Sequence, residues 1–314
     1  SMNFNLEDLL NGKRLAISRA LSIVENSAVI PEALNKAIYG HIGHAHRVGI
    51  TGSPGAGKSS LLDALISIWR QEEKTVGIIS IDPTSPFTGG AILGDRIRML
   101  RHHKDKGVFI RSMATRGNLG GLADKAQESA DIMDIAGFDI IVFETVGVGQ
   151  VELDVAKAAD TTIVVLVPEN GDDIQAMKAG LTEIADIFTI NKADRDGSNQ
   201  AFVQVQNMIE MRFHGSENWI PTISKTSTLT NEGIEDLYRN INMHYQYLKS
   251  SKTLEKNRLN RISSKIQSLL NTLILDEFWT ALRKQYLDQY LSNFDNTLTS
   301  NEIIKVLKEI DKPQ

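Results

Sequence analysis

The stretch Gly52-Ser53-Pro54-Gly55-Ala56-Gly57-Lys58-Ser59 decides the fold of this chain. It matches the pattern G-x-x-x-x-G-K-[S/T]. The β-branched run at residues 48–51 before it predicts a strand, and the apolar spacing of residues 61–69 after it predicts a helix. A strand, a glycine-rich loop and a helix in this order predict a phosphate-binding loop, or P-loop.

The residue types in this loop suit phosphate. Glycines let the backbone turn successive N–H groups inward, and the helix N-terminus that follows favours an anion. Lys58 is expected to reach the β- and γ-phosphates, and Ser59 to place its hydroxyl on Mg²⁺. The residues expected to bind the nucleotide phosphates are Gly52, Pro54, Gly55, Ala56, Gly57, Lys58, Ser59 and Ser60.

Short apolar runs alternate with helical patterns through the middle of the chain. Seven of these runs predict strands, at residues 48–51, 76–82, 108–111, 140–144, 162–167, 187–191 and 220–224. Each run is almost continuously apolar, which is typical of strands covered on both faces. The pattern predicts an α/β fold, a P-loop NTPase with a mostly parallel sheet flanked by helices.

Helical patterns also precede and follow this region. We expect an N-terminal helical extension at residues 1–46, a nucleotide-binding domain at 47–247, and a C-terminal helical arm at 248–314. In the arm, apolar residues recur mostly at helical spacing, at Leu254, Leu259, Ile262, Ile266, Leu269 and Leu270. The arm is therefore expected to pack on the sheet or on a second subunit.

Composition narrows the class of partners. The 314 residues carry a formal net charge of −5, which disfavours a cationic surface for nucleic acid. The chain has no cysteine, and no run approaches the apolar length of a membrane span. We expect a cytoplasmic protein that binds neither membrane nor nucleic acid.

A second motif concerns the nucleotide base. Asn191-Lys192-Ala193-Asp194 follows a predicted strand and matches N-K-x-D. The Asp194 carboxylate can accept from the ring N–H and the exocyclic amino group of guanine, a donor pair that adenine lacks. Lys192 would lie along the base, and Asn191 would hold the loop. A further guanine contact is expected just after the next predicted strand, in a register left open between residues 224–225 and 227–228.

Three acidic residues stand where Mg²⁺ and switch segments are expected. Asp82 and Glu144 end predicted strands, and Asp95 follows the hydroxyl-rich segment 83–90. Hard oxygen ligands suit Mg²⁺, so these acids and Ser59 form the expected metal set. In the E-x-x-G that begins at Glu144, the Gly147 N–H is the expected γ-phosphate sensor.

The water-positioning residue is the least defined part of the site. Gln150 lies soon after Gly147 and is a candidate to orient the attacking water. The expected catalytic residues are Lys58, Glu144, Gly147 and Gln150. We expect slow intrinsic turnover, because arginine fingers supplied by partners complete such sites in other GTPases.

Together, these residues resemble the methylmalonyl-CoA mutase-associated GTPases, the MeaB/ArgK family (LAO/AO transport ATPase-like), over residues 14–237. The landmarks are residues 49–59 (GITGSPGAGKS), 81–83 (IDP), 89–96 (GGAILGDR), 144–150 (ETVGVGQ), 171–173 (GDD) and 183–194 (EIADIFTINKAD). The resemblance favours Ser227, Thr228 and Leu229 as the second guanine loop. It also implies a further switch near residues 171–178, with Asp172, Asp173 and Lys178 as candidates.

The resemblance implies a function as well. Members of this family act as homodimeric chaperones that bind an adenosylcobalamin-dependent acyl-CoA mutase, gate cofactor loading, and protect or reactivate the mutase. The C-terminal arm would be the dimerisation region. Residues 168–171 read PENG where the family resemblance predicts smaller residues. This departure concerns coupling to the partner and leaves nucleotide binding intact.

Other functions compete with this interpretation. A nickel-delivery GTPase would need imidazole or soft ligands, and His41, His44 and His46 cluster before the first predicted strand, with His102 and His103 later. A GTP-binding scaffold without significant hydrolysis would keep the same motifs. An ATP-dependent kinase is disfavoured by the N-K-A-D sequence, which predicts guanine.

Overall fold

The computed structural model describes residues 4–82, 102, 104–114, 122–145, 151–168, 180–294 and 297–311. Its contacts group the chain into two compact units, Ser1–Arg258 and Leu259–Gln314. The predicted domain boundaries at residues 46/47 and 247/248 stay predictions. No helix in the described ranges is long and apolar enough to cross a membrane.

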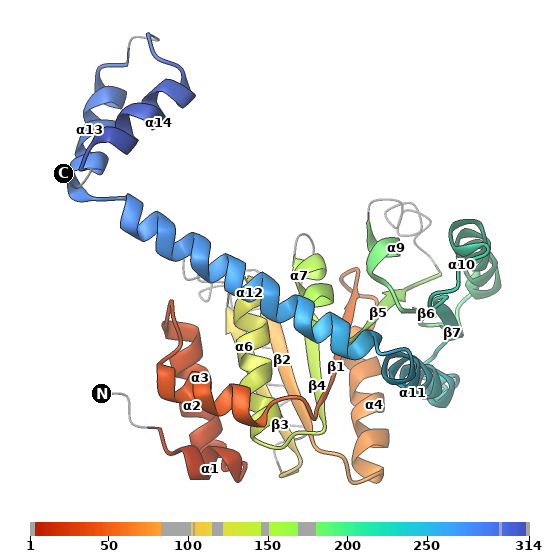
Figure 1. The fold of residues 1–314 in the computed structure, drawn as a ribbon. Coiled ribbons are helices and arrows are strands. Elements are labelled where there is room, and N and C mark those ends of the chain that lie inside the picture. The colour runs from red at the N-terminus through yellow and green to blue at the C-terminus, as the bar shows by residue number, and fades with distance from the viewer. Residues whose placement is uncertain are drawn as a thin grey trace. The chain divides into compact units, whose positions relative to one another are not determined.

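The first unit is built on a seven-stranded parallel sheet (Figure 1). The strands are β1 (His46–Gly52), β2 (Val76–Asp82), β3 (Val108–Ala114), β4 (Ile140–Thr145), β5 (Thr161–Leu166), β6 (Ile187–Ile190) and β7 (Thr222–Lys225). Their spatial order is β3-β2-β4-β1-β5-β6-β7, and all described pairs are parallel. The fold class predicted from the sequence is confirmed.

All seven predicted strands are present, with small shifts at their ends. The largest shift is in β3, which ends at Ala114 rather than at residue 111, and β7 begins at Thr222 rather than at residue 220. Pro221 has no N–H to donate to the neighbouring strand, so it stands before the ladder instead of in it. In the middle of the sheet, β1 starts two residues earlier than predicted because His46 still pairs in register with Ile140.

Helices cover both faces of the sheet. In the first unit they are α1 (Leu6–Leu10), α2 (Arg14–Asn26), α3 (Glu32–His41), α4 (Lys58–Gln71), α6 (Leu122–Ile135), α7 (Val151–Ala158), α9 (Leu181–Ile184), α10 (Ser198–Phe213) and α11 (Ile234–Ser250). Apolar residues of α4 and α11 pack with one set of strand residues, and those of α6 and α7 pack with the alternate set. The alternation follows from the two-residue period of a strand.

The N-terminal helices belong to the same core as the sheet. Figure 1 shows α2 and α3 beside α6, and these pairs are in contact. Residues at helical spacing along α2, such as Ile17, Leu21 and Val24, are fully buried in a cluster with α6 residues. Burying each such side chain contributes roughly 1.5–3 kcal/mol. The extension is therefore part of the folding unit and not a loose appendage.

A buried charge network fixes the entry into β1. The Asp134 carboxylate accepts hydrogen bonds from the backbone N–H groups of Gly43, His44 and Ala45, at 3.1–3.3 Å. The Arg47 guanidinium lies 2.6 Å from Asp131 and 3.6 Å from Asp134. Buried charges of this kind are tolerated only when paired and hydrogen-bonded. The network joins the N-terminal helices to the start of the central strand.

The second unit contains most of α12 (Thr253–Phe278) with α13 (Ala281–Ser292) and α14 (Ser300–Glu309). A capping box between Thr299 and Glu302 starts α14, and the Arg283 guanidinium donates to carbonyl oxygens at its end. Along α12, apolar residues at intervals of three, four and seven are exposed at Leu259, Ile266, Leu270, Leu273 and Ile274.

Replacing Asp134 tests the charge network. Asp134→Ala removes the acceptor of three backbone N–H groups and one partner of Arg47, so we expect a loss of about 3 kcal/mol in the free energy of unfolding. Urea denaturation followed by circular dichroism measures it. Glu32→Ala breaks an exposed pair with Lys36 and should cost less than about 0.5 kcal/mol. Equal losses in the two variants would contradict the role given to Asp134.

Candidate functional site

The loop between β1 and α4 has backbone conformations that two of its glycines make possible. Gly57 has φ +85° and directly precedes the first helical residue, Lys58. A Cβ at Gly57 would lie 2.5 Å from the side-chain amide nitrogen of Asn191, and a Cβ at Gly52 would lie 2.3 Å from the carbonyl oxygen of Val165. Glycine lets the loop pass close to both neighbours. The loop is thus held against β5 and against the segment after β6.

Lys58 lies at the start of α4 and is largely buried. Its ammonium group donates a hydrogen bond to the carbonyl oxygen of Gly52, at the other end of the loop. Burial lowers the pKa of Lys58, and the nearby charge of Glu152 opposes that change. The amine is therefore positioned within the loop, where a phosphate would supply a stronger countercharge.

Ser59, Ser80 and Glu144 come together beside the loop. The Ser59 hydroxyl donates to one carboxylate oxygen of Glu144 at 2.9 Å, and the Ser80 hydroxyl donates to the other at 3.2 Å. The Glu144 side chain is buried, with 2% of its surface exposed. Asp82 is the last residue of the neighbouring strand β2, and its side chain lies outside the described part of the structure.

The donors at this position fit Mg²⁺ chemically. A hydroxyl and a carboxylate in mutual contact are hard oxygen ligands, and Mg²⁺ bound to nucleotide needs only one or two protein carboxylates. Among the described residues, no three acidic or histidine side chains gather as a metal cluster. Of the remaining predicted residues, Asp95, Gly147 and Gln150 lie outside the described ranges.

The predicted base loop contacts the phosphate loop directly. The Asn191 amide donates to the carbonyl oxygen of Ala56 at 2.8 Å, and the Lys192 ammonium donates to that of Gly55 at 2.6 Å. The Thr226 hydroxyl donates to the Asn191 amide oxygen at 3.1 Å. Two motifs separated by more than 130 residues therefore form one site.

The segment after β7 adds a contact to Asp194. The Ser227 hydroxyl donates to the Asp194 carboxylate at 2.7 Å, and this hydrogen bond holds the pKa of Asp194 below its usual value. Thr228 and Leu229 follow in an exposed turn, and Leu229 is 84% exposed. Residues 224–225 instead belong to β7. Of the two registers left open by the sequence, the one containing Ser227 reaches Asp194.

Sequence reasoning missed two residues that hold these side chains in place. Ser80 lies opposite Glu144 in the β2–β4 register, so its role becomes visible only once the strands are paired. Thr226 is fully buried and follows β7 directly. The hydroxyl residues at 226–228, directly after the strand, were the available signal for Thr226.

The histidines considered for nickel do not converge in the described residues. His46 is buried, with its ring stacked on Tyr245 at a centroid distance of 3.9 Å. The His44 backbone N–H bonds to Asp134, while the His102 ring lies 3.3 Å from Asp63. His103 lies outside the described ranges. No metal cluster of histidine and acidic residues is found in the part of the chain described here, and nickel delivery is not favoured.

The fold and the site define a P-loop NTPase: a parallel sheet with a glycine-rich loop leading into a helix, joined to an N-K-x-D segment. The family model described as methylmalonyl Co-A mutase-associated GTPase MeaB matches residues 17–283. The chain belongs to this family, as its sequence motifs predicted, and is a GTPase.

Relatives with similar sequence or structure agree with this assignment. A protein of Pyrococcus horikoshii named as a GTPase is 46% identical over 271 residues, covering 86% of each chain. The GTPase ArgK of Escherichia coli is 32% identical, covering 99% of this chain and 96% of its own. A crystal structure of an LAO/AO transport system kinase has a TM-score of 0.72 at 26% identity, covering 97% and 95%.

The contact between the phosphate loop and the base loop predicts that a methyl group added at Gly57 weakens nucleotide binding. Gly57→Ala places a Cβ within 2.5 Å of the Asn191 amide and keeps a left-handed backbone at a non-glycine residue. We expect GDP affinity to fall at least about tenfold, because the close contact with Asn191 and the left-handed backbone each cost roughly 1–2 kcal/mol. Titration with a fluorescent GDP analogue measures it. Gly40→Ala, which has open space around its Cβ, should bind GDP like the native chain.

Proposed function

We propose that this chain is a Mg²⁺-dependent GTPase that acts as a chaperone for an adenosylcobalamin-dependent acyl-CoA mutase. It would gate cofactor loading and protect or reactivate the mutase. The observation that carries the GTPase half is the hydrogen bond that joins Asn191 of the base loop to Ala56 of the phosphate loop. The mutase half rests on the family, whose description names an association with methylmalonyl-CoA mutase. The absence of cysteine agrees with a cytoplasmic location.

Guanine recognition would come from Asp194. A carboxylate accepts two hydrogen bonds side by side, which matches the ring N–H and amino group of guanine. The Ser227 hydroxyl occupies one carboxylate oxygen and orients the group. Lys192 and the turn at Thr228 and Leu229 would complete the walls around the base. Adenine would be disfavoured because it offers no matching pair of donors to the charged Asp194 carboxylate.

Hydrolysis would depend on positioning and on neutralising charge. Lys58 and the loop N–H groups would hold the β- and γ-phosphates, and Gly147 would contact the γ-phosphate. Ser59, Asp82, Asp95 and Glu144 would hold Mg²⁺, directly or through water. The metal would supply charge neutralisation on the phosphate oxygens. Because Glu144 is held by Ser59 and Ser80, its carboxylate is already oriented toward α4.

The partner would respond to segments that change with the nucleotide. Gln150 would orient water, and Asp172, Asp173 and Lys178 would signal nucleotide state to the mutase; all lie outside the described ranges. The described structure supports the connection through the chain, since α7 begins at Val151 and α9 at Leu181, each just after such a segment. These two helices pack against each other.

A titration with GTP, GDP, ATP and XTP tests the base site. For the native chain we expect GTP and GDP to bind far better than ATP. Asp194→Asn should weaken GTP about a hundredfold, because two hydrogen bonds to a charged acceptor are lost. The same variant should gain affinity for XTP, since xanthine carries a carbonyl where guanine has its amino group. Unchanged GTP affinity in Asp194→Asn would reject the role of this carboxylate.

Phosphate release with and without a purified adenosylcobalamin-dependent acyl-CoA mutase tests the partner. We expect slow turnover alone, a complex on size exclusion, and a changed rate when mutase is added. Heat-denatured mutase is the control. Tight GTP binding with no phosphate release under any condition would favour the scaffold alternative. If the mutase does not change the rate of hydrolysis and forms no complex with the chain, the chaperone proposal is rejected and only the GTPase activity remains.

We also propose that the chain forms a homodimer through the exposed apolar row of α12. Such spacing is typical of a helix that packs on a partner helix. Ile266→Glu places a charge in the row, so we expect it to shift the species seen by light scattering from dimer to monomer. Gln267→Glu adds the same charge at the next exposed position and should leave the dimer intact. A native chain that is monomeric at micromolar concentration would contradict the proposal.

A further inference from the structure

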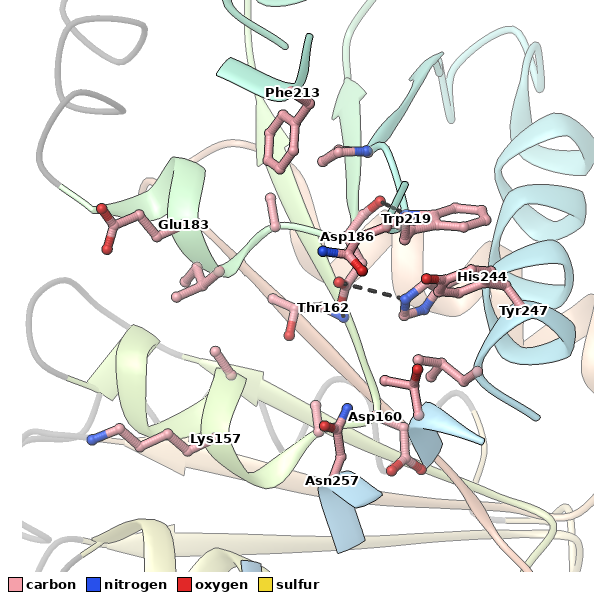
Figure 2. Close-up of a pocket in the computed structure, with 18 of the residues that line it drawn as sticks. Lys157, Asp160, Thr162, Glu183, Asp186, Phe213, Trp219, His244, Tyr247 and Asn257 are labelled. Carbon is pink, nitrogen blue, oxygen red and sulfur yellow. Dashed lines mark hydrogen bonds and ion pairs between the residues drawn. The ribbon is translucent and has the colours of Figure 1, made fainter. Parts of the chain in front are cut away.

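A second cavity of about 520 Å³ lies in the first unit. Its volume is within the roughly 300–1,000 Å³ range of small-molecule sites. Figure 2 shows Asp186 at its centre, with the Trp219 and His244 rings beside it and Tyr247 further along the same wall. Apolar side chains, among them Phe213 and Leu248, complete the lining.

This cavity is separate from the nucleotide site. Asp160, Asp186 and Pro221 line it and directly precede β5, β6 and β7. The base loop begins at Asn191, directly after β6. Five residue steps at about 3.3 Å each put roughly 16 Å between Asp186 and Asn191. The cavity is therefore at the amino edge of the sheet, and the nucleotide loops are at the carboxyl edge.

The walls of the cavity are ordered by hydrogen bonds and ring contacts. The Trp219 indole N–H donates to the backbone carbonyl of Asp186 at 2.9 Å. The Trp219 ring lies 4.9 Å from the His244 ring and 5.4 Å from the Tyr247 ring, measured between centroids. Thr161 connects His244 to His46, with its hydroxyl 2.7 Å from one ring and 2.8 Å from the other. The aromatic wall is thus fixed before any ligand arrives.

Asp186 lacks a strong cationic partner in the described residues. One carboxylate oxygen accepts from the Thr162 N–H at 2.8 Å, and the other lies 3.5 Å from the His244 ring. Burial lowers the pKa of His244 to about 4, so the ring is neutral. The other two acidic residues at the cavity are paired with arginines. Asp160 lies 3.6 Å from Arg258, and Glu183 lies 3.2 Å from Arg212.

From this arrangement we propose that the cavity binds a small organic cation. The ligand would carry an ammonium or guanidinium group on an apolar or aromatic body, with Asp186 as the counter-ion and the Trp219 and Tyr247 rings as walls. Aromatic faces attract such cations, and a half-buried carboxylate strengthens the attraction. The side chain of Asp186 keeps 30% of its surface exposed, which leaves room for the contact.

Other ligand classes fit the cavity less well. No three acidic or histidine side chains gather in the described residues, so a bare metal ion has no ligand set here. An anion would face Asp160 and Asp186 in addition to Glu183 at the rim. Lys157 is the one lysine that lines the cavity. In Figure 2 its amine points away from Asp186.

The protonation of Asp186 gives the proposal a pH signature. Burial, with the nearby charge of Asp160, raises the pKa of Asp186 to about 7. A cation requires the carboxylate, so affinity should rise as pH increases through 7 and level off above it. Affinity for the cation should be about tenfold lower at pH 6 than at pH 8, because at pH 6 the Asp186 carboxyl group must first lose its proton. The titratable and charged groups around Asp186 are Asp160, His244, Tyr247, Glu183, Lys157 and Arg258.

Binding of phenethylammonium and of agmatine to the full chain tests the proposal, by saturation-transfer NMR and calorimetry. We expect saturable binding, and at least about tenfold weaker binding of phenethyl alcohol, which has no charge to pair. Asp186→Asn keeps an oxygen for the Thr162 N–H, so the variant should fold. It should bind either cation at least about tenfold more weakly and without the pH dependence.

Two controls separate this site from a general charge effect and from the nucleotide site. Asp196→Asn removes the same charge from an exposed loop and should bind the probes like the native chain. GDP affinity should be the same in Asp186→Asn as in the native chain. The test of this cavity is therefore independent of the tests of the proposed GTPase function. The proposal is overturned if neither cation saturates, if phenethyl alcohol binds equally well, or if native binding is independent of pH between 6 and 8.

Discussion

The hydrogen bond from the Asn191 amide to the Ala56 carbonyl is the contact that joins the two loops proposed to bind the nucleotide. It ties the loop that follows β1 to the loop that follows β6, although β5 lies between these strands. The bond forms because parallel strands bring their carboxyl ends to one edge of the sheet. Gly57 permits the approach, and Thr226 holds the Asn191 oxygen from the other side. These contacts hold the two loops at a fixed separation.

Much of this arrangement could be predicted from the sequence. Glu144 ends an almost continuously apolar run, and similar runs directly precede the P-loop and Asn191, so both the strands and the motifs at their ends were visible in the sequence. The order of strands was not visible, since it depends on which crossovers pack best. For this reason Ser80, which meets Glu144 only across the β2–β4 pair, could not be found from the sequence.

The entry to β1 shows a different limit of sequence reasoning. Residues 41–46 contain three histidines, a pattern that suggests a metal site when only spacing is considered. In the structure, His46 is a buried strand residue, and the backbone around His44 is held by Asp134 from α6. A carboxylate about ninety positions away gives the segment its structure. Local patterns cannot show whether a polar residue is satisfied by a distant partner.

The contacts of Thr161 restrict how protons are placed along the amino edge of the sheet. Its hydroxyl has one proton and stands between two neutral imidazoles, His46 and His244, so one ring must accept and the other must donate. If the His244 ring accepts the hydrogen bond from Thr161, its remaining N–H faces the Asp186 carboxylate. If the ring donates to Thr161 instead, its unprotonated nitrogen faces Asp186, and the carboxyl group has to carry the proton. A proton on Asp186 is compatible with the second of these arrangements, and the row of contacts ends at His46 on β1, the strand that leads into the phosphate loop.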